Sequence, residues 1–409
     1  MSAGRLVSAA LTSSTFDETA LSVIAVGKAA ASMATAFMAA CGSQVTGGLV
    51  ISTHGSAPQG LRYAEGAHPV PDERSEAAAR AALQIAAECL PDGRLVVLVS
   101  GGASALMALP APGVSLIDKS ATVSSLLAAG ADITSLNCVR KHLSAIKGGR
   151  LAAAAMAPVT AWLISDVVGD EPSVIGSGPT VPDPGTFADA LDVLDRFGGR
   201  SRFPDAARRY LEAGVRGERP ETPKTARDLP FASTRVIGSA EQAREGAAAH
   251  ARALGYDVVM CPAPIVGEAR EAAVAHLAWV GTAVGARRHP TCVIASGETT
   301  VQVKGRGRGG RNQEFALAAA IELEARALSW TVASIGTDGV DGPTDAAGAC
   351  IDETTCGWGR GLGLDASAAL GDNDSWTFLD RVGALIRTGP TDTNVGDVQL
   401  VILGDHPQS

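Results

Sequence analysis

Short apolar runs alternate with alanine-rich helical stretches along most of this chain of 409 residues, and this alternation constrains the fold more than any other feature. Strand-like runs that alternate with helical stretches predict parallel sheets covered by helices on both faces. We therefore predict an α/β fold. The predicted strands are residues 21–26, 48–52, 95–100, 159–165, 258–260, 291–296, 331–335 and 398–403, and the predicted helices are residues 29–40, 73–89, 115–129, 137–155 and 242–254.

A stretch rich in arginine and proline, residues 199–233, interrupts this alternation. A chain of this length suits two domains, and a strand-helix unit begins again at residues 235–254. We therefore predict one domain over residues 1–225 and a second domain over residues 226–409.

The composition excludes several classes of protein. The formal net charge of −9 is opposite to the basic surface that phosphate neutralisation needs, so we expect no nucleic-acid partner. No apolar run approaches the roughly 20 residues that span a bilayer, and the first residues lack the pattern of a signal peptide. The seven cysteines are scattered and form no C-x-x-C pair, which is typical of reduced thiols. We expect a cytoplasmic protein with no membrane partner.

Polar residues gather where the predicted strands end, which is the edge at which open α/β sheets bind ligands. Lys28 follows the first strand and Gly27, and we favour a functional lysine over a surface one. A glycine-rich turn after strand 95–100 opens a helix, and its backbone N–H groups suit phosphate or carboxylate. The alternative is a tight turn that serves packing. The residues of this turn are Ser100, Gly101, Gly102, Ala103 and Ser104.

Two further segments of the first half carry candidate ligands. Polar residues at spacings of three and four predict neighbouring helix faces that either meet solvent or bind an anion. These residues are Asn137, Arg140, Lys141, Ser144 and Lys147. After the next strand, Asp166 and Asp170 have the oxygen ligands that Mg²⁺ prefers, with turn capping as the equal alternative. Gly178 lies in the glycine-rich segment that follows them.

The run 305–315, GRGRGGRNQEF, allows three interpretations. A repeated RGG tail is excluded because this run is single and lies between predicted elements. Gly305, Gly307 and Gly310 satisfy the G-x-G-x-x-G spacing of a dinucleotide loop, but arginines occupy places where that loop needs small residues. We favour the third interpretation, an anion site in which Arg311 and Asn312 make bidentate contacts to phosphate or carboxylate.

Acidic and polar residues follow the later strands as well. The loop 336–345, GTDGVDGPTD, contains three carboxylates, and we favour a general-base or metal-binding role over simple turns. Thr337 and Asp338 lie near its start. Glu298 follows strand 291–296, and Asn394 lies in the last polar loop, so both are candidate binding residues.

Eight segments of the chain follow, in order, the motifs of one known family. They are GKAAASMA, AHPVPDERS, SGGASALM, NCVRKHLSAIKGGRLA, SDVVGDEPSVIGSGPTVPDP, SGETTVQVKGRGRGGRNQEFALA, SIGTDGVDGPTDAAGA and GPTDTNVGD. Together they resemble class II glycerate 2-kinases, whose C-terminal half is the leucine-rich MOFRL domain and of which several members are labelled hydroxypyruvate reductases. The resemblance runs from about residue 20 to residue 404. It departs from the family in a shorter leader and at Ala25 and Val26, where glycine and alanine are usual.

The resemblance implies a Rossmann-like N-terminal domain and a MOFRL-type C-terminal α/β domain, with the active site in the cleft between them. It implies phosphorylation of D-glycerate at the 2-hydroxyl, with ATP and Mg²⁺, to give 2-phosphoglycerate. The catalytic positions carried over are Lys28, Arg311 and Asp338. Lys28 and Arg311 would stabilise the charge of the phosphates or of the glycerate carboxylate, and Asp338 would orient or deprotonate the 2-hydroxyl of glycerate. A hydroxypyruvate reductase that uses NAD(P)H and a non-catalytic anion-binding protein are the alternatives, and the oligomeric state is left open, with a homodimer as one option.

Overall fold

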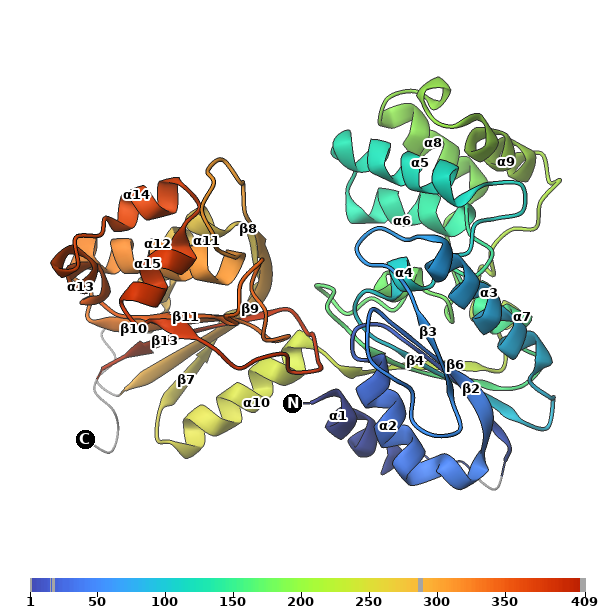
Figure 1. Ribbon diagram of the computed structural model, residues 1–409, viewed down its shortest axis with the longest axis horizontal. Helices are drawn as coiled ribbons and strands as arrows, with labels where there is room; N and C mark the ends of the chain where they lie inside the picture. Colours follow the sequence, from blue (N-terminus) through green and yellow to red (C-terminus); the bar gives the residue numbers. More distant parts are fainter. Residues whose placement is uncertain (1, 15, 17–18, 286–289, 405–409) are drawn as a thin grey trace. The chain divides into compact units, whose positions relative to one another are not determined.

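The computed structural model describes residues 2–14, 16, 19–285 and 290–404. The chain divides into two compact units, the first ending at Gly238 and the second beginning at Ser239. Each unit has its own sheet and its own hydrophobic core (Figure 1). Within the described residues, no helix combines the length and the apolar character that crossing a bilayer requires.

The first unit contains a six-stranded sheet in the order β3-β2-β1-β4-β5-β6. All of its pairings are parallel, as the alternation of strands and helices predicts. This order is that of the dinucleotide-binding α/β folds, in which the strand order reverses between the first and fourth strands. The strands are β1 (Leu21–Val26), β2 (Val45–Ser52), β3 (Arg62–Glu65), β4 (Arg94–Val99), β5 (Val159–Ile164) and β6 (Ala232–Gly238).

Helices cover both faces of this sheet, and further helices pack around a second core of the same unit (Figure 1). One face is covered by α1 (Ala3–Leu11) and α2 (Ala30–Cys41), and the other by α3 (Glu73–Glu88) and α7 (Arg150–Ala154). The short α4 (Ala103–Leu106) follows β4. The second core lies between α5 (Leu116–Ala128), α6 (Ile133–His142), α8 (Phe187–Arg196) and α9 (Asp205–Val215).

Two sequence predictions for this unit differ from the structure. β6 pairs in parallel with β5, so the strand that was expected to open the second domain belongs to the first sheet, and the units divide after Gly238 rather than at residue 225. The helix predicted over residues 137–155 is broken into α6, which ends at His142, and α7, which begins at Arg150. Gly148 and Gly149, directly before α7, have φ of 58° and 79°, so the segment between the two helices is not helical. Positive φ values end an α-helix and suit glycine.

The second unit contains a mixed sheet in the order β12-β11-β10-β13-β9-β7, and β8 also pairs with β9. The α/β class is confirmed, but the prediction of a parallel sheet is wrong for this unit. Among the described strands, only β7 and β8 run parallel to their neighbour, because β13 returns between β9 and β10 and is antiparallel to both. The strands are β7 (Asp257–Met260), β8 (Ile265–Glu268), β9 (Thr291–Thr300), β10 (Trp330–Gly336), β11 (Gly348–Ile351), β12 (Leu385–Ile386) and β13 (Asp397–Leu403).

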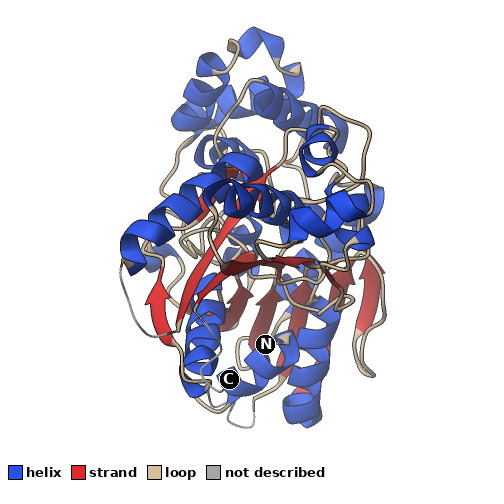
Figure 2. Cartoon of the chain, turned by 90° about the vertical axis from the view of Figure 1, so that its left-hand side faces the viewer, coloured by secondary structure: helices blue, strands red, loops and turns tan. Residues whose placement is uncertain are grey.

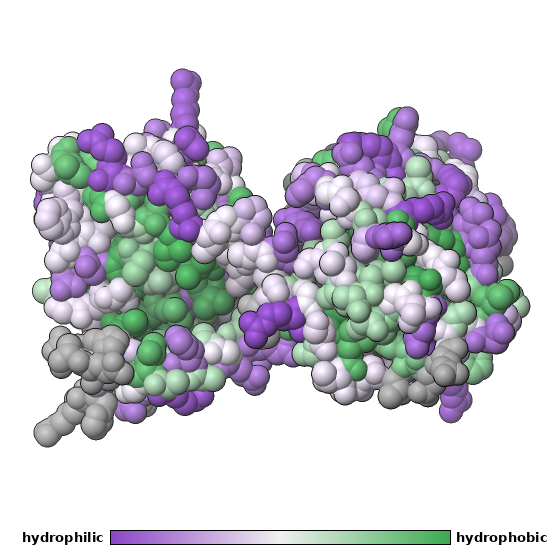
Figure 3. Space-filling model, turned by 60° about the horizontal axis from the view of Figure 1, so that its bottom comes forward, coloured by the Kyte–Doolittle hydropathy of each residue, from purple (hydrophilic) through white to green (hydrophobic). Residues whose placement is uncertain are grey.

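Helices cover the two faces of this second sheet unequally. One face carries α11 (Ala269–Val284), α12 (Arg311–Arg326), α13 (Thr355–Gly361), α14 (Ala366–Gly371) and α15 (Ser375–Arg381). The other face carries α10 (Ala240–Ala253), which packs against β7 and β9. The strands run side by side as twisted sheets among these helices (Figure 2). Figure 3 shows a hollowed apolar area on this unit, and half-buried side chains such as Ile335 and Val398 lie on the less covered face.

Candidate functional site

Lys28 lies at the point where the strand order of the first sheet reverses, between the ends of β1 and β4. Its backbone N–H donates to the carbonyl of Gly101 (2.9 Å), and the N–H of Ala29 donates to the hydroxyl of Ser100 (3.1 Å). A Cβ on Gly27 would lie 2.1 Å from Oγ of Ser100, so only glycine allows the two loops to approach. The side chain of Lys28 is exposed at this edge, where open α/β sheets bind their ligands.

His68 lies against the same edge. A Cβ on Gly102 would be 3.1 Å from Cδ2 of His68 and 3.5 Å from Cγ of Lys28, so the three residues lie together. Partial burial, and then the charge of Lys28, lower the pKa of His68, so the neutral form of its ring is favoured. His68 lies in the segment AHPVPDERS, in which the residue spacing alone does not indicate a ligand.

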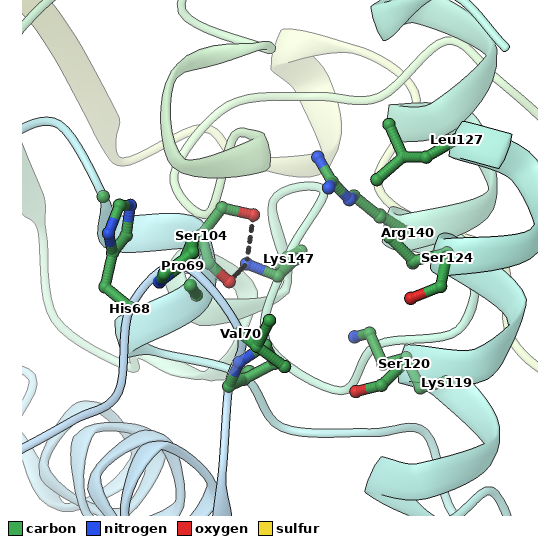
Figure 4. A pocket seen from close by; sticks show the side chains of 15 residues that line it. His68, Pro69, Val70, Ser104, Lys119, Ser120, Ser124, Leu127, Arg140 and Lys147 are labelled. Atoms are coloured by element: carbon green, nitrogen blue, oxygen red, sulfur yellow. Dashed lines mark hydrogen bonds between the residues drawn. The ribbon is translucent and has the colours of Figure 1, made fainter. Parts of the chain in front are cut away.

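A pocket of about 390 Å³ opens beside these residues in the first unit (Figure 4). Three cationic side chains line it: Lys119 from α5, Arg140 from α6, and Lys147 from the turn after α6. None of the described residues that line it carries a carboxylate, so the pocket suits an anion. The lining residues are His68, Pro69, Val70, Pro71, Gly102, Ser104, Ala105, Ala108, Lys119, Ser120, Val123, Ser124, Leu127, Arg140 and Lys147.

Lys147 is buried, and protein oxygens hold its ammonium group. Its Nζ donates to the carbonyl of Ser104 (2.8 Å), to the hydroxyl of the same residue (3.1 Å) and to the carbonyl of Gly176 (3.5 Å). The Ser104 hydroxyl lies 2.9 Å from that of Ser177, which donates to the amide oxygen of Asn137 (3.0 Å). The amide nitrogen of Asn137 is buried with no hydrogen-bond partner among the described residues, so its N–H groups are unused.

The glycine-rich turn that follows β4 divides between two roles. Gly102 and Ser104 line the pocket. Ser100 and Gly101 instead hold the loop after β1, and Ala103 belongs to the hydrophobic core. Of the five residues predicted to bind phosphate or carboxylate, only Gly102 and Ser104 therefore line the pocket, together with cationic side chains from other segments.

Two other predicted binding residues, Lys141 and Gly178, are used inside the protein. Lys141 forms a buried ion pair with Asp183 (3.3 Å) and does not line the pocket. The polar residues predicted on neighbouring helix faces therefore do not share one site: Arg140 lines the pocket, whereas Lys141 pairs with Asp183. The carbonyl of Gly178 accepts from the N–H of Gly149 (2.7 Å), which fixes the turn between α6 and α7.

Lys119 is the least satisfied cation of the pocket. Lys119 is only 5% exposed, and its Nζ has no hydrogen-bond partner among the described residues. Burial, and then the charge of Arg140, lower its pKa to about 7. Burial also lowers the pKa of Lys147, with further repulsion from Lys119 and Arg140. Like charges held together in a poorly solvated site are unfavourable, and a bound anion would offset that cost.

Replacing Lys119 with methionine should stabilise the protein by about 1–3 kcal/mol near pH 6, because an unpaired buried charge is removed. The pKa of Lys119 is lower in the folded than in the unfolded chain, so the folded state binds fewer protons between about pH 7 and the ordinary lysine pKa near 10.4. The advantage of the variant should therefore fade as pH rises through that window. Urea unfolding at about pH 6 and about pH 9.5 measures this difference.

The control for this experiment is Arg202→Met, which removes an exposed positive charge from the same unit. Its effect should stay within about 0.5 kcal/mol at both pH values, as for most surface substitutions. Equal stability of wild type and Lys119→Met near pH 6 would mean that Lys119 is hydrated in the folded protein.

The predicted metal ligands, Asp166 and Asp170, follow β5. Among the described residues, no three histidine, cysteine, aspartate or glutamate side chains gather in a cluster. Asp170 has φ of 52°, and its Oδ1 is buried with no hydrogen-bond partner among the described residues. Mg²⁺ is commonly held by one or two carboxylates together with substrate phosphates. The orphaned oxygen of Asp170 therefore fits such a cation, whereas Asp166 makes other interactions within the protein.

Arg311 is the first residue of α12 in the second unit, and its guanidinium group binds two carboxylates of this chain. Its Nε donates to Oδ2 of Asp397 (2.6 Å) and its Nη2 to Oδ1 (2.9 Å), while Nη1 lies 3.0 Å from Oε1 of Glu298. Burial opposes the charge of Arg311, but the hydrogen bonds and charge of Asp397 outweigh it and raise the pKa of the arginine. The bidentate partner is thus a buried carboxylate of this chain rather than an open site. The sequence alone does not connect Arg311 with Asp397, which lies 86 residues away.

Asn312, the other predicted contact of this helix start, is buried, and both polar atoms of its amide make hydrogen bonds within the protein. Its amide nitrogen donates to Oδ1 of Asp341 (3.2 Å), and its amide oxygen accepts from the hydroxyl of Ser334 (2.6 Å). Asp341 also accepts from the backbone N–H groups of Asn312 and Gln313, so it caps α12. Asn312 therefore positions the start of the helix through contacts inside the protein.

Asp338 lies in the loop after β10 and is half-buried. Its Oδ1 accepts from the N–H of Val340 (3.1 Å), and its other carboxylate oxygen has no hydrogen-bond partner among the described residues. The neighbouring Thr337 donates to the carbonyl of Gly396 (2.6 Å), and the amide oxygen of Asn394 accepts from the N–H of that glycine (3.1 Å). Thr337 thus ties two loops together, Asn394 fixes the turn of the second loop, and Asp338 presents a carboxylate oxygen beside Thr337.

The glycine-rich loop 304–310 lies against the turn between α14 and α15. Its backbone N–H groups at Lys304 and Gly305 both donate to Oδ1 of Asn373 (2.8 and 2.9 Å). A Cβ on Gly305 would lie 2.1 Å from the carbonyl oxygen of Asp372, and a Cβ on Gly307 would lie 2.3 Å from Cβ of Asp374. The glycines are therefore required for packing. The N–H groups of the first half of the loop are used within the protein, so the loop lacks the free backbone that a dinucleotide site needs.

Replacing Gly307 with alanine should destabilise the protein by about 1–3 kcal/mol, because the new methyl group overlaps the 372–375 turn. Gly246, inside α10, has nothing within 4 Å of its ideal Cβ, and the matched change Gly246→Ala should stabilise by about 0.5–1 kcal/mol. Urea unfolding compares the two variants. A neutral Gly307→Ala would show that the loop does not need its close approach.

Comparisons with known proteins agree with this architecture. Residues 3–212 match the family described as "Domain of unknown function (DUF4147)", and residues 291–397 match the MOFRL family. A "Glycerate 2-kinase" of Pyrococcus horikoshii is 38% identical over 93% of this chain and 87% of the relative. A protein of Agrobacterium vitis named "Putative hydroxypyruvate reductase" is 40% identical over 93% of this chain and 87% of the relative.

A solved structure extends the likeness to three dimensions. The crystal structure of a glycerate kinase from Thermotoga maritima matches with a TM-score of 0.89 at 37% identity, and the match covers 99% of this chain and 96% of that chain. Both matched domains occur here in one chain and in the order that the motifs predict. The chain therefore belongs to the DUF4147–MOFRL family, the class II glycerate kinases that its motifs resemble.

Proposed function

We propose that this protein transfers the terminal phosphoryl group of ATP to the 2-hydroxyl of D-glycerate, giving 2-phosphoglycerate and ADP. The observation that carries the proposal is the glycerate 2-kinase relative that matches 93% of the chain. The first unit supports it, because Lys28 lies at the switch point of its sheet beside a pocket of three cations. Phosphoryl transfer depends mainly on positioning and on positive charge around the moving group.

Three residues have proposed roles in this reaction. Lys28 stabilises the negative charge of the transferred phosphoryl group. Asp338 accepts the proton of the 2-hydroxyl through the carboxylate oxygen that makes no hydrogen bond to a described residue. Arg311 contributes its charge while Asp397 holds its fork in one orientation, so it acts as a fixed cation. The hydroxyl oxygen then forms the new bond to phosphorus, and ADP leaves with the electrons of the broken bond.

Mg²⁺ is the proposed metal ion, with Asp170 as its protein ligand and Asp166 as the second candidate. When bound, such an ion neutralises phosphate charge and orients the phosphate chain. The orphaned Oδ1 of Asp170 is the observation that favours this residue. A cytoplasmic location and a homodimer stay predictions.

A paired assay tests the proposed function. Purified protein should release ADP from ATP only when D-glycerate is present, and the product should carry phosphate at the 2-position. NADH oxidation with hydroxypyruvate, without ADP release, would favour the reductase named among the relatives. Formation of 3-phosphoglycerate alone would contradict the proposed position of phosphorylation.

A further inference from the structure

The pocket of the first unit carries more positive charge than a glycerate carboxylate requires. Lys119 and Arg140 line it, and neither makes a hydrogen bond or ion pair to another described residue through its side chain. Lys147 adds a third cation whose ammonium is already held by Ser104. A single carboxylate has one negative charge, whereas a phosphate chain distributes several charges over the length of such a site.

The same pocket has an apolar side. Val70, in the loop after β3, is 67% exposed, and Leu127, near the end of α5, is 54% exposed. Both line the pocket, together with Val123 and the two prolines beside Val70. Exposed apolar side chains that border a concave site mark a surface for a partly apolar ligand. Glycerate has only three carbons, each bonded to oxygen, and offers no apolar part to such a surface.

We propose that this pocket binds the nucleotide, with the phosphate chain against Lys119, Arg140 and Lys147 and the base against Leu127 and Val70. The inference rests on the proposed kinase reaction for its choice of ligand. The volume of about 390 Å³ is in the range of pockets that hold a small organic ligand. His68 and Gly102 line one part of the pocket and lie next to Lys28, so the end of the phosphate chain would reach the lysine at the switch point.

Nucleotide binding should then take up protons near neutral pH. The groups that face Lys119 in the pocket are Arg140, Lys147 and His68, and none of them is an acid. With a pKa of about 7 in the free protein, Lys119 is partly neutral, and a bound polyanion favours its charged form. Affinity for ATP should therefore fall as pH rises above about 7, because the lysine must bind a proton first.

Titration calorimetry on the full chain tests the inference with four probes: ATP, inorganic tripolyphosphate, adenosine and D-glycerate. Lys119→Met should weaken ATP and tripolyphosphate at least tenfold and leave adenosine unchanged. Leu127→Ser should weaken ATP and adenosine about threefold to fivefold and leave tripolyphosphate unchanged. In two buffers of different ionisation enthalpy, ATP binding near pH 7.5 should take up protons in the wild type and fewer in Lys119→Met.

Control variants and contrary outcomes separate this inference from the proposed function. Arg202→Met, which removes an exposed charge outside the pocket, should leave all four affinities within twofold. If Lys119→Met weakens D-glycerate and leaves ATP unchanged, the pocket binds the acceptor and the inference is overturned, while the kinase reaction stands. If the wild type binds ATP with these sensitivities but never phosphorylates glycerate, the proposed function fails and the nucleotide site stands. Should Lys119→Met not fold, Arg140→Gln tests the same phosphate contacts.

Discussion

Replacing Asp338 with asparagine should lower kcat by about 10²–10⁴-fold, the loss typical of a missing general base. The fold should be preserved, because an asparagine oxygen can still accept the hydrogen bond from the N–H of Val340. Affinity for ATP should change little if the carboxylate acts only on the glycerate hydroxyl. Steady-state kinetics and direct ATP titration measure the two effects separately.

The matched control is Asp345→Asn in the same loop, a carboxylate that is occupied by Trp376 and Arg387. Its kcat should stay within about threefold of wild type, well under 1 kcal/mol in transition-state free energy. If raising the Mg²⁺ concentration restores Asp338→Asn, the carboxylate is a metal ligand instead of a base. A near-normal kcat for Asp338→Asn would remove this residue from the catalytic set and leave it as a turn cap.

Replacing Arg311 with lysine should lower kcat/KM by roughly 30-fold to 1,000-fold, on the order of 2–4 kcal/mol, although the charge is kept. An ammonium group cannot make the two parallel hydrogen bonds that the guanidinium donates to Asp397. Because Asp397 is 0% exposed, an imperfect partner should also reduce the free energy of unfolding, by about 1–3 kcal/mol. Kinetics and urea unfolding on the same preparation measure both losses.

A double-mutant cycle with Asp397→Asn separates the two contributions. If Arg311 acts only by holding Asp397 and its loop, the two single variants should lose similar activity and the double variant little more. If the charge of Arg311 also acts on the substrate, Arg311→Lys should keep more activity than Arg311→Met. Arg311→Met should also lose more stability than Arg311→Lys, because it leaves the buried carboxylate of Asp397 without a cation. Activity of Arg311→Lys within about threefold of wild type would make the arginine purely structural.

The first sheet could be predicted from sequence because its strands are continuous apolar runs. β1 occupies the predicted residues 21–26, and β4 and β5 differ from their predictions by single residues at their ends. Strands buried on both faces leave such runs, and the helices between them force parallel pairing. β3, β8, β11 and β12 could not be predicted, because strands of two to four residues carry too little periodicity and these four lack the neighbouring apolar run that indicates β7. The antiparallel order of the second sheet depends on where β13 inserts, which no local pattern records.

The candidate site divides in the same way. Lys28 was predictable because a strand end places it at a binding edge whatever the rest of the chain does. Lys119 was not, since a lysine on an amphipathic helix is usually solvated, and only the packing of α5 against the rest of the unit buries it. Arg311 was identified by its position at a helix start, but its partner Asp397 is brought to it by the sheet.

The shape of the glycine-rich loop 304–310 is set by residues about seventy positions further along the chain. Asn373 accepts from two of its N–H groups and donates its amide nitrogen to Glu314, which is itself paired with Arg270. The loop contributes backbone to these contacts, and the side chains of Arg306 and Arg308 remain exposed. The shape and the charge of the loop therefore depend on different residues. Replacing Arg306 would change the charge and leave these backbone contacts in place, whereas a change at Asn373 would alter the loop without touching its sequence.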